Sequence, residues 1–254
     1  MQNSNLSFSD FVNYDIIEEN KHLIEDNYNI KFDDKTLRKL NTELLTDNVQ
    51  QLDYLLKKYP KMQEYIENKQ VILTAENFKN KTTVACFSYD VEHKSLDFKL
   101  SKKKFINYDN FIKKQKENIE KYYCMPCADN KVSVYSITHE YGHFIENMLI
   151  SEYNELNPTE YANMLKKLEK AKTSIQENTI FLNWEKSIAD TIQDEILEIA
   201  KEKSTFFNPM TYLSTYGNTN SFEFFAECFA NMECGKSNIL GEAMKEFLKR
   251  RNLL

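Results

Sequence analysis

Residues 134–149 read VYSITHEYGHFIENML, and this stretch decides the fold. Its apolar side chains recur at helical spacing, which predicts an amphipathic helix. His139 and His143 are four residues apart, so they lie on one face of that helix, about one turn from each other. A glycine inside a helix costs about 1 kcal/mol relative to alanine, so Gly142 predicts close approach by a neighbouring helix. The periodic apolar residues are Val134, Ile137, Tyr141, Phe144, Ile145 and Leu149.

Residues 139–143 form an H-E-x-x-H pattern, which indicates a metal site. The imidazoles of His139 and His143 can bind one zinc ion. Glu140 lies about 100° round the helix from His139, close enough to reach a metal-bound water without binding the metal itself. Its carboxylate would be the general base that takes the proton of this water during attack on a peptide carbonyl. The pattern predicts peptide hydrolysis; the alternative is a helix face where two histidines happen to lie one turn apart.

A catalytic zinc site needs a third protein ligand and an open position for water. His22 and His93 lie in segments without an accompanying motif. Glu223 and Glu227 are better candidates, because they lie four residues apart on a predicted helix face that is otherwise apolar. Spacing alone does not decide which of them binds metal. Glu223 also has a purely structural alternative, a capping box that begins at Asn220.

Two segments together carry a family resemblance. Residues 139–143 read H-E-x-G-H, and residues 216–229 read Y-G-x-T-N-x-x-E-F-F-A-E-x-F. In this order they resemble the catalytic domain of anthrax lethal factor and its relatives, which are zinc metallopeptidases of the gluzincin type. Similar sequences occur in phage head-morphogenesis proteins. The resemblance covers about two dozen of the 254 residues, and the chain has additional helical sequence over 151–207, so substrate specificity is not implied.

The resemblance implies an α+β fold, a mainly helical zincin-like domain with a small three- to four-stranded sheet and the H-E-x-x-H segment on the active-site helix. It implies one Zn²⁺ per chain, bound by His139, His143 and Glu223. Tyr216 would donate a hydrogen bond to the tetrahedral intermediate, and Glu227 would hydrogen-bond a ligand histidine. Glu140 keeps its role as general base. The alternative for Tyr216 is a buried aromatic side chain before a turn.

Composition supports a helical, acidic protein. The chain has 33 Lys and Arg against 39 Asp and Glu, a formal net charge of −6, so nucleic-acid binding is not expected. Only 4 Gly and 4 Pro disfavour glycine-rich nucleotide loops and turn-dense β-sandwiches. The five cysteines lack the spacing that is typical of a disulfide-rich scaffold, which indicates a reducing compartment. No signal peptide or membrane span is recognised, so a cytoplasmic location is expected, with virion association or dedicated delivery as alternatives.

The remaining pattern divides the chain into two parts. Residues 1–68 predict a helical N-terminal segment of three or four helices packed on a zinc metallopeptidase domain at 69–254. Short runs of strand-forming residues predict a small meander of about three strands. These runs are 71–73, 82–87 and 96–100. Further helices are expected over 108–123, 157–173, 183–203, 222–232 and 241–251.

Two other motifs are interpreted as structural features without a chemical role. Cys124-x-x-Cys127 could be half of a structural zinc site or a redox pair, but a turn with two small apolar residues is favoured because no second C-x-x-C exists. A lysine-rich run favours a solvated surface, with docking of an acidic substrate or of nucleic acid as the alternative. Its members are Lys99, Lys102, Lys103, Lys104, Lys113, Lys114 and Lys116.

The sequence thus predicts a zinc endopeptidase whose peptide or protein substrate lies extended along an edge strand drawn from residues 71–100. A phage or mobile-element assembly protein that keeps the fold with little proteolysis is the alternative. All of the expected site residues are present, which favours the enzyme. A site that no longer catalyses would be expected to lose its general base first. A serine hydrolase is not supported, since no G-x-S-x-G occurs. No membrane partner is expected, and an inhibitor, immunity or virion partner is left open.

Overall fold

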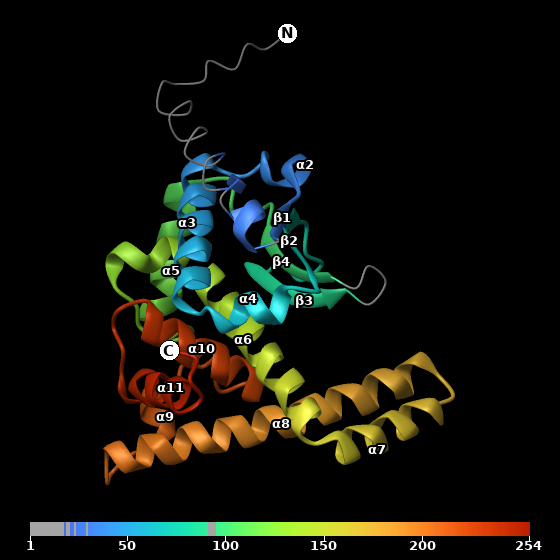
Figure 1. The fold of residues 1–254 in the computed structure, drawn as a ribbon. Coiled ribbons are helices and arrows are strands. Elements are labelled where there is room, and N and C mark those ends of the chain that lie inside the picture. The colour runs from blue at the N-terminus through green and yellow to red at the C-terminus, as the bar shows by residue number, and fades with distance from the viewer. Residues whose placement is uncertain (1–17, 19–20, 23, 29, 91–94) are drawn as a thin grey trace.

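The computed structural model describes residues 18, 21–22, 24–28, 30–90 and 95–254. These residues form a mostly helical α+β fold with one small sheet, as expected from the sequence (Figure 1). The strands are β1 (Ile30–Phe32), β2 (Gln70–Glu76), β3 (Ala85–Asp90) and β4 (Ser95–Ser101). The helices are α2 (Asp34–Leu37), α3 (Thr42–Lys58), α4 (Lys61–Ile66), α5 (Tyr108–Glu120), η1 (Asp129–Val134, a 3₁₀ helix), α6 (Tyr135–Leu156), α7 (Pro158–Glu169), α8 (Ser174–Lys203), α9 (Pro209–Tyr212), α10 (Ser221–Glu233) and α11 (Ile239–Arg250). The helical pattern before residue 18 and His93 lie outside the described residues.

The sheet is mixed, with strand order β1-β2-β4-β3. β2 runs parallel to both β1 and β4, whereas β3 pairs antiparallel with β4 at the edge. The predicted meander is therefore wrong, because β4 is inserted between β2 and β3. β4 is buried along most of its length, which suits a central position. β1 was not predicted from the sequence, since three residues are too few to reveal a strand period.

Helix α6 joins the sheet to the C-terminal helices. It packs against α10, α3 and β3. Phe144 contacts Phe98 of β4 edge to face, with ring centroids 5.3 Å apart, while Tyr141 lies 6.1 Å from Phe229 of α10. Such aromatic pairs contribute about 0.5–1.5 kcal/mol each beyond their burial. The apolar side of α6 is thus fixed on both flanks.

Gly142 is a point of close approach between α6 and α10. A Cβ atom at this position would lie 2.9 Å from Cα of Ala226 and 3.2 Å from Cβ of Phe229. A backbone atom cannot move aside as a flexible side chain can, so any larger residue would push the helices apart. The close approach expected from the sequence is confirmed.

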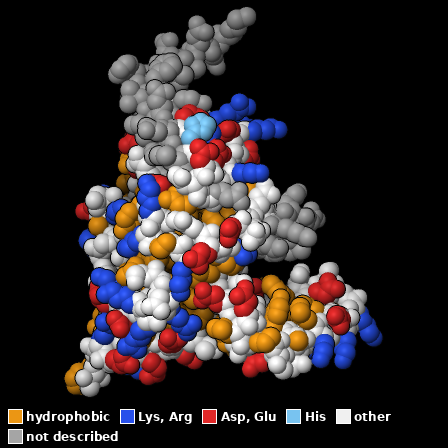
Figure 2. All heavy atoms as spheres, viewed as in Figure 1, with side chains coloured by type: hydrophobic (Ala, Val, Ile, Leu, Met, Phe, Trp, Pro, Cys, Tyr) orange, Lys and Arg blue, Asp and Glu red, His pale blue; other side chains and the backbone are white. Residues whose placement is uncertain are grey.

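Helices α7 and α8 form an arm that projects from the body (Figure 1). The C-terminal half of α8 packs against α11 and α10, whereas its first turns continue into the arm beside α7. α8 begins at Ser174, nine residues earlier than predicted, because Thr173 caps it by accepting a hydrogen bond from the Gln176 amide. Hydrophobic side chains gather on this arm (Figure 2), including Ile175 and Leu182, which are 77% and 57% exposed.

One hydrophobic cluster extends over the described chain from Ile24 to Leu253 and includes residues on both sides of position 68. The segment predicted to be only helical before that position contributes β1 to the sheet. Within the described residues, every helix is either too short or too polar to cross a bilayer.

Candidate metal centre

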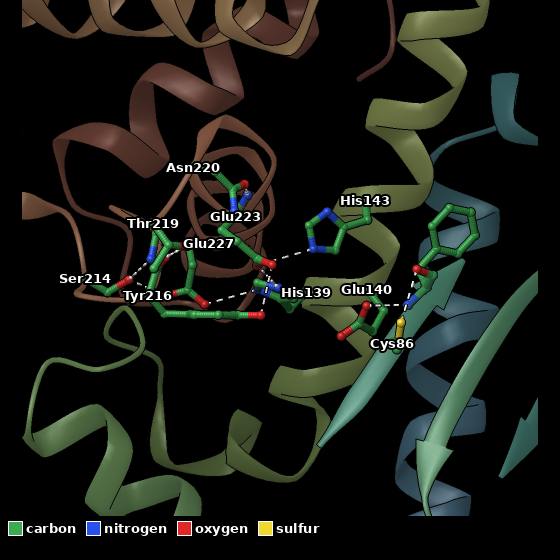
Figure 3. A network of polar contacts seen from close by, with 12 residues as sticks. Cys86, His139, Glu140, His143, Ser214, Tyr216, Thr219, Asn220, Glu223 and Glu227 are labelled. Atoms are coloured by element: carbon green, nitrogen blue, oxygen red, sulfur yellow. Dashed lines mark hydrogen bonds and ion pairs between the residues drawn. The ribbon is translucent and has the colours of Figure 1, made fainter. Parts of the chain in front are cut away.

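His139, His143 and Glu223 converge at the contact of α6 and α10 (Figure 3). One potential ligand atom of each lies within 4.8 Å of the others. Oε2 of Glu223 is 3.0 Å from Nε2 of His139 and 3.4 Å from Nε2 of His143. The two imidazole rings are nearly perpendicular, at 83°. The group is buried to half-buried and could hold a metal ion.

The start of α10 explains how Glu223 reaches the histidines. Asn220 is the N-cap, and its side-chain oxygen accepts a hydrogen bond from the Glu223 amide at 3.0 Å. The expected N-cap at Asn220 is therefore confirmed, but capping is not the sole role of Glu223. Its carboxylate, however, points to His139 and His143 (Figure 3). One residue thus both takes part in the helix cap and faces the histidine pair.

Tyr216 faces the same group from the loop before α10. Its hydroxyl donates a hydrogen bond to Oε1 of Glu223 at 2.9 Å, and its ring stacks on His139 at a centroid distance of 5.6 Å. The ring of Tyr123 stacks on Tyr216 at 5.5 Å. Burial and the negative charge of Glu223 raise the pKa of Tyr216, so its phenol keeps its proton at neutral pH. The side chain is partly buried, yet its hydroxyl points into the site.

Glu227 is fully buried one turn further along α10. Its Oε1 lies 3.1 Å from Nδ1 of His139 and accepts a hydrogen bond from Tyr135 at 3.0 Å. Its Oε2 accepts from the Met125 amide at 2.7 Å and from the Ser214 hydroxyl at 2.6 Å. Four donors therefore meet one carboxylate, which fixes the ring of His139. The contact with a histidine was expected; the other three donors were not predicted from the sequence.

The Cys124-x-x-Cys127 segment supplies one of these donors through Met125. Both cysteines are free and buried in a small apolar cluster with Cys234. Burial raises the pKa of the Cys127 thiol to about 11, which disfavours the thiolate that metal binding needs. These facts agree with the interpretation as a turn that holds two small apolar residues.

Glu146 was missed by sequence reasoning. It is only 2% exposed, and its Oε2 lies 3.6 Å from Nδ1 of His143. Its Oε1 has no hydrogen-bond partner among the described residues, and burial raises its pKa to about 7. The available signal was its position three residues after His143, which places both on one helix face.

The charges of the group are strongly coupled. Burial opposes the protonated form of His143, but hydrogen bonds to Glu146 and Glu223 outweigh it and raise the pKa to about 9. Burial likewise opposes protonation of His139, whose contacts with Glu223 and Glu227 raise its pKa well above the usual value. Burial would raise the pKa of Glu223, but both histidines hold it far below the usual range. A bound cation would balance the charge of the carboxylates in place of these protons, and the histidines would release their protons when it binds.

Glu140 lies on the other side of the histidines, against the sheet (Figure 3). Its Oε2 accepts a hydrogen bond from the Phe87 amide of β3 at 2.6 Å. Burial raises its pKa, although both histidines partly oppose the shift. The edge strand therefore fixes this carboxylate next to the candidate metal centre, a contact that no sequence pattern indicated.

Three hollows lie at the site, and the central one shares lining residues with each of the other two; together they are called the cleft. The central hollow, of about 180 Å³, contains Glu140 and Tyr216. The arm-side hollow, of about 740 Å³, shares both residues and extends past His143 to α8. The lysine-lined hollow, of about 350 Å³, shares Gln115 and Tyr123 with the central one and lies between the β2–β3 loop and α5.

No family model matches the chain, and neither does any curated protein or solved structure.

Proposed function

We propose that the chain is a zinc-dependent endopeptidase. The observation that carries this proposal is the convergence of His139, His143 and Glu223 from two helices, with Glu140 on the same helix as the histidines. Two imidazole nitrogens, one carboxylate oxygen and a nearby second carboxylate form the donor set of a hydrolytic zinc site. The resemblance to the lethal-factor family points to the same chemistry.

The distances from Glu223 to the two histidines are close to those of a zinc site. A tetrahedral site with metal–ligand distances of about 2.0–2.1 Å holds its ligand atoms about 3.3–3.4 Å apart. Oε2 of Glu223 lies 3.0 and 3.4 Å from Nε2 of His139 and His143. Nδ1 of each histidine faces a further carboxylate, Glu227 or Glu146, which orients the ring and increases the basicity of Nε2. When bound there, zinc would polarise a water molecule and the scissile carbonyl.

Glu140 is the proposed general base. One of its oxygens is held by the Phe87 amide, which leaves the other to accept the proton of the attacking water. Burial raises its pKa and so makes the carboxylate a better proton acceptor near neutral pH. The same carboxyl group would then deliver that proton to the leaving amine.

Tyr216 is the proposed hydrogen-bond donor to the oxyanion. Its raised pKa keeps the phenol protonated, and its hydroxyl already points at Oε1 of Glu223 beside the histidines. A donor fixed before the reaction stabilises developing negative charge without reorganisation at that moment. The stacking of its ring between His139 and Tyr123 supports this fixed orientation.

Strand β3 is the proposed substrate guide. The carbonyl of Val84 accepts a hydrogen bond from the Ser101 amide, so the backbone groups of Ala85 and Phe87 both face the outer side of the edge strand. The Phe87 amide donates to Glu140 there, which leaves the backbone groups of Ala85 for a substrate. Ala85 lines both the central and the arm-side hollows. An extended polypeptide could therefore pair with β3 while its scissile bond faces Glu140.

The decisive experiment combines metal content with cleavage of a proteome-derived peptide library. We expect about one zinc per chain after purification without chelators and cleavage that stops on chelation. Glu140→Gln should retain zinc and lose turnover by about 10²- to 10⁴-fold, because the amide cannot accept the proton. Glu155→Gln, exposed on the same helix, is the matched control and should leave turnover unchanged. Undiminished cleavage by Glu140→Gln, or in the presence of chelator, would contradict the proposal, and cleavage by neither chain would favour the assembly-protein alternative.

A further inference from the structure

The lysine-lined hollow is a part of the cleft that the proposed chemistry does not use. Lys81 of the β2–β3 loop, Lys104 after β4 and Lys114 of α5 line it. These three cations come from segments that are separate in sequence. No Asp or Glu belongs to its described lining, which otherwise contains Thr82, Val84, Asn110, Phe111, Gln115, Asn118 and Tyr123. The hollow therefore concentrates positive charge in a chain whose formal net charge is −6.

The three lysines are poorly neutralised by the protein itself. Lys114 pairs with Glu117 at 3.0 Å, but its side chain is 61% exposed, and exposed pairs of this kind contribute little. For Lys81 and Lys104, the described residues provide no acidic partner within 4 Å. Like charges around one concavity favour an anion that enters it, because low-dielectric walls focus their field.

The lysine-lined hollow adjoins the proposed active site. It shares Gln115, Asn118 and Tyr123 with the central hollow, and the ring of Tyr123 stacks on Tyr216. The amide of Gln115 is already oriented, since it donates to the Ser136 hydroxyl at 2.7 Å. A polypeptide that crosses the central hollow would therefore bring a flanking side chain to the lysines.

The opposite end of the cleft has a different character. The arm-side hollow is lined by Phe181, Leu182 and Phe222, together with the carboxylates of Glu146 and Glu185. Phe181 and Leu182 are 39% and 57% exposed on the arm. At this end an acidic side chain would meet a single lysine, Lys69, among several carboxyl groups and apolar rings. At the lysine-lined end it would meet three lysines and, in the described lining, no carboxyl group, so that end favours it.

We infer that the lysine-lined hollow binds an acidic side chain of the substrate, so that the chain prefers polypeptide segments that are acidic on one side of the scissile bond. The position of the acidic side chain relative to a scissile bond rests on the proposed function, whereas the binding of an acidic side chain does not require catalysis. It selects one of the two alternatives for the lysine-rich run, docking of an acidic substrate, for Lys104 and Lys114. The exposed neighbours Lys103 and Lys113 do not line the hollow, and for them we keep the interpretation as a solvated surface.

The test compares two triple variants of equal charge. Lys81→Gln/Lys104→Gln/Lys114→Gln removes the cations of the hollow, and Lys79→Gln/Lys103→Gln/Lys113→Gln removes exposed lysines one or two positions away. In the proteome-derived library, the wild type should cleave sites with Asp or Glu enriched on one side only. The hollow variant should lose this enrichment, whereas the control variant should keep it. Unchanged enrichment in the hollow variant, or equal loss in both, would overturn the inference.

A binding measurement makes the test independent of turnover. The probes are two fluorescein-labelled, alanine-rich peptides, identical except that one carries glutamates where the other carries glutamines, and the protein is zinc-loaded Glu140→Gln. We expect the glutamate peptide to bind about tenfold more tightly at low salt, and this preference to vanish only in the hollow triple variant. Equal binding of both peptides would overturn the inference even where the library is cleaved, and a preserved glutamate preference without any cleavage would sustain it while the proposed function fails.

A single-stranded oligonucleotide of thymidines separates the remaining alternative. Phosphate-backbone binding would use all exposed lysines and should weaken equally in both triple variants. Oligonucleotide binding that exceeds glutamate-peptide binding and depends on both triples would overturn the inference in favour of a nucleic-acid surface.

Discussion

Glu227 and Glu146 lie behind the two histidines of the candidate metal centre, and their surroundings differ. Glu227, on the α10 side, receives hydrogen bonds from three donors besides His139 and is fully buried. Glu146, on the cleft side, is almost as buried but has only a contact of 3.6 Å with His143. Its second oxygen lacks a partner among the described residues.

The difference shows that the two sides of the site are held by different means. A buried carboxylate that satisfies four donors connects segments from residues 125, 135, 139 and 214, and its removal would leave the Tyr135 and Ser214 hydroxyls without this acceptor. A buried carboxylate with little compensation costs free energy when ionised, and this is reflected in the raised pKa of Glu146. We therefore call the α10 side, which Glu227 holds, the rigid wall. We expect the cleft side, where Glu146 lies, to tolerate substitutions better.

The largest effect is expected where both sides meet. Glu223→Ala removes the carboxylate that contacts both histidines and should eliminate tight zinc binding almost completely. Zinc titration followed by calorimetry measures the loss. Glu242→Ala, an exposed acidic residue in the first turn of α11, should bind zinc like the wild type. Wild-type affinity in Glu223→Ala would remove this residue from the ligand set.

Tyr216→Phe should have the next largest effect. Loss of one fixed oxyanion donor should lower kcat by about 10²- to 10³-fold, with zinc content unchanged. Stopped-time peptide cleavage and metal analysis check both parts of the expectation. A drop in thermal stability as large as that of a core substitution would show instead that the phenol is structural, because its ring stacks between His139 and Tyr123.

The next largest effect is a difference in zinc affinity and stability between variants of the two carboxylates that contact the histidines. Glu227→Ala should weaken zinc affinity by about 10- to 100-fold. It should also lower the free energy of unfolding of the metal-free chain, because the buried Tyr135 and Ser214 hydroxyls lose this acceptor and the Met125 amide keeps only the Tyr135 hydroxyl. Glu146→Ala should weaken affinity less than Glu227→Ala and leave stability nearly unchanged. Competition with a fluorescent chelator and chemical denaturation give both numbers. If the two variants reverse their order, the assignment of the rigid wall is wrong.

The smallest effect concerns another carboxylate of the cleft side. Burial raises the pKa of Glu185 to about 7, above the ordinary value of 4.5. The folded state then holds the proton more tightly than the unfolded state, so the free energy of unfolding decreases as pH rises through about 7. Glu185→Gln should therefore be more stable than the wild type above about pH 7, with an advantage that shrinks towards about pH 4.5.

Thermal denaturation across this pH range measures the advantage, and Asp194→Asn, exposed on the same helix, should show none. A pH-independent difference for Glu185→Gln would mean that this carboxyl group titrates normally.

Much of the helical framework and the candidate metal centre could be predicted from the sequence. The period of α6 is strong, and His139, His143 and Glu223 are brought together as expected. The approach of α10 could be inferred because Gly142 breaks a local preference for which only a tertiary contact compensates.

The sheet order and the supporting contacts could not be predicted. Whether β3 or β4 becomes the edge depends on long-range packing, and the two strands have similar local preferences. The Phe87 and Met125 donors are backbone amides, which every non-proline residue has, so no residue type marks them. Glu146 had a usable signal, its spacing to His143, but glutamate at this spacing is common on solvated helices.

The closeness of α6 and α10 at Gly142 also has a consequence for how the protein is made. Glu223 follows His143 by 80 residues, so a ribosome that has finished α6 must still produce α7, α8 and α9 before the third ligand exists. On the proposed function, the growing polypeptide carries its base and both imidazoles but cannot hold zinc tightly, and hydrolytic capacity is withheld until α10 has been synthesised. Ribosome-arrested chains that stop before Ser221 should accordingly fail to retain zinc; retention by such chains would show that delay to be absent.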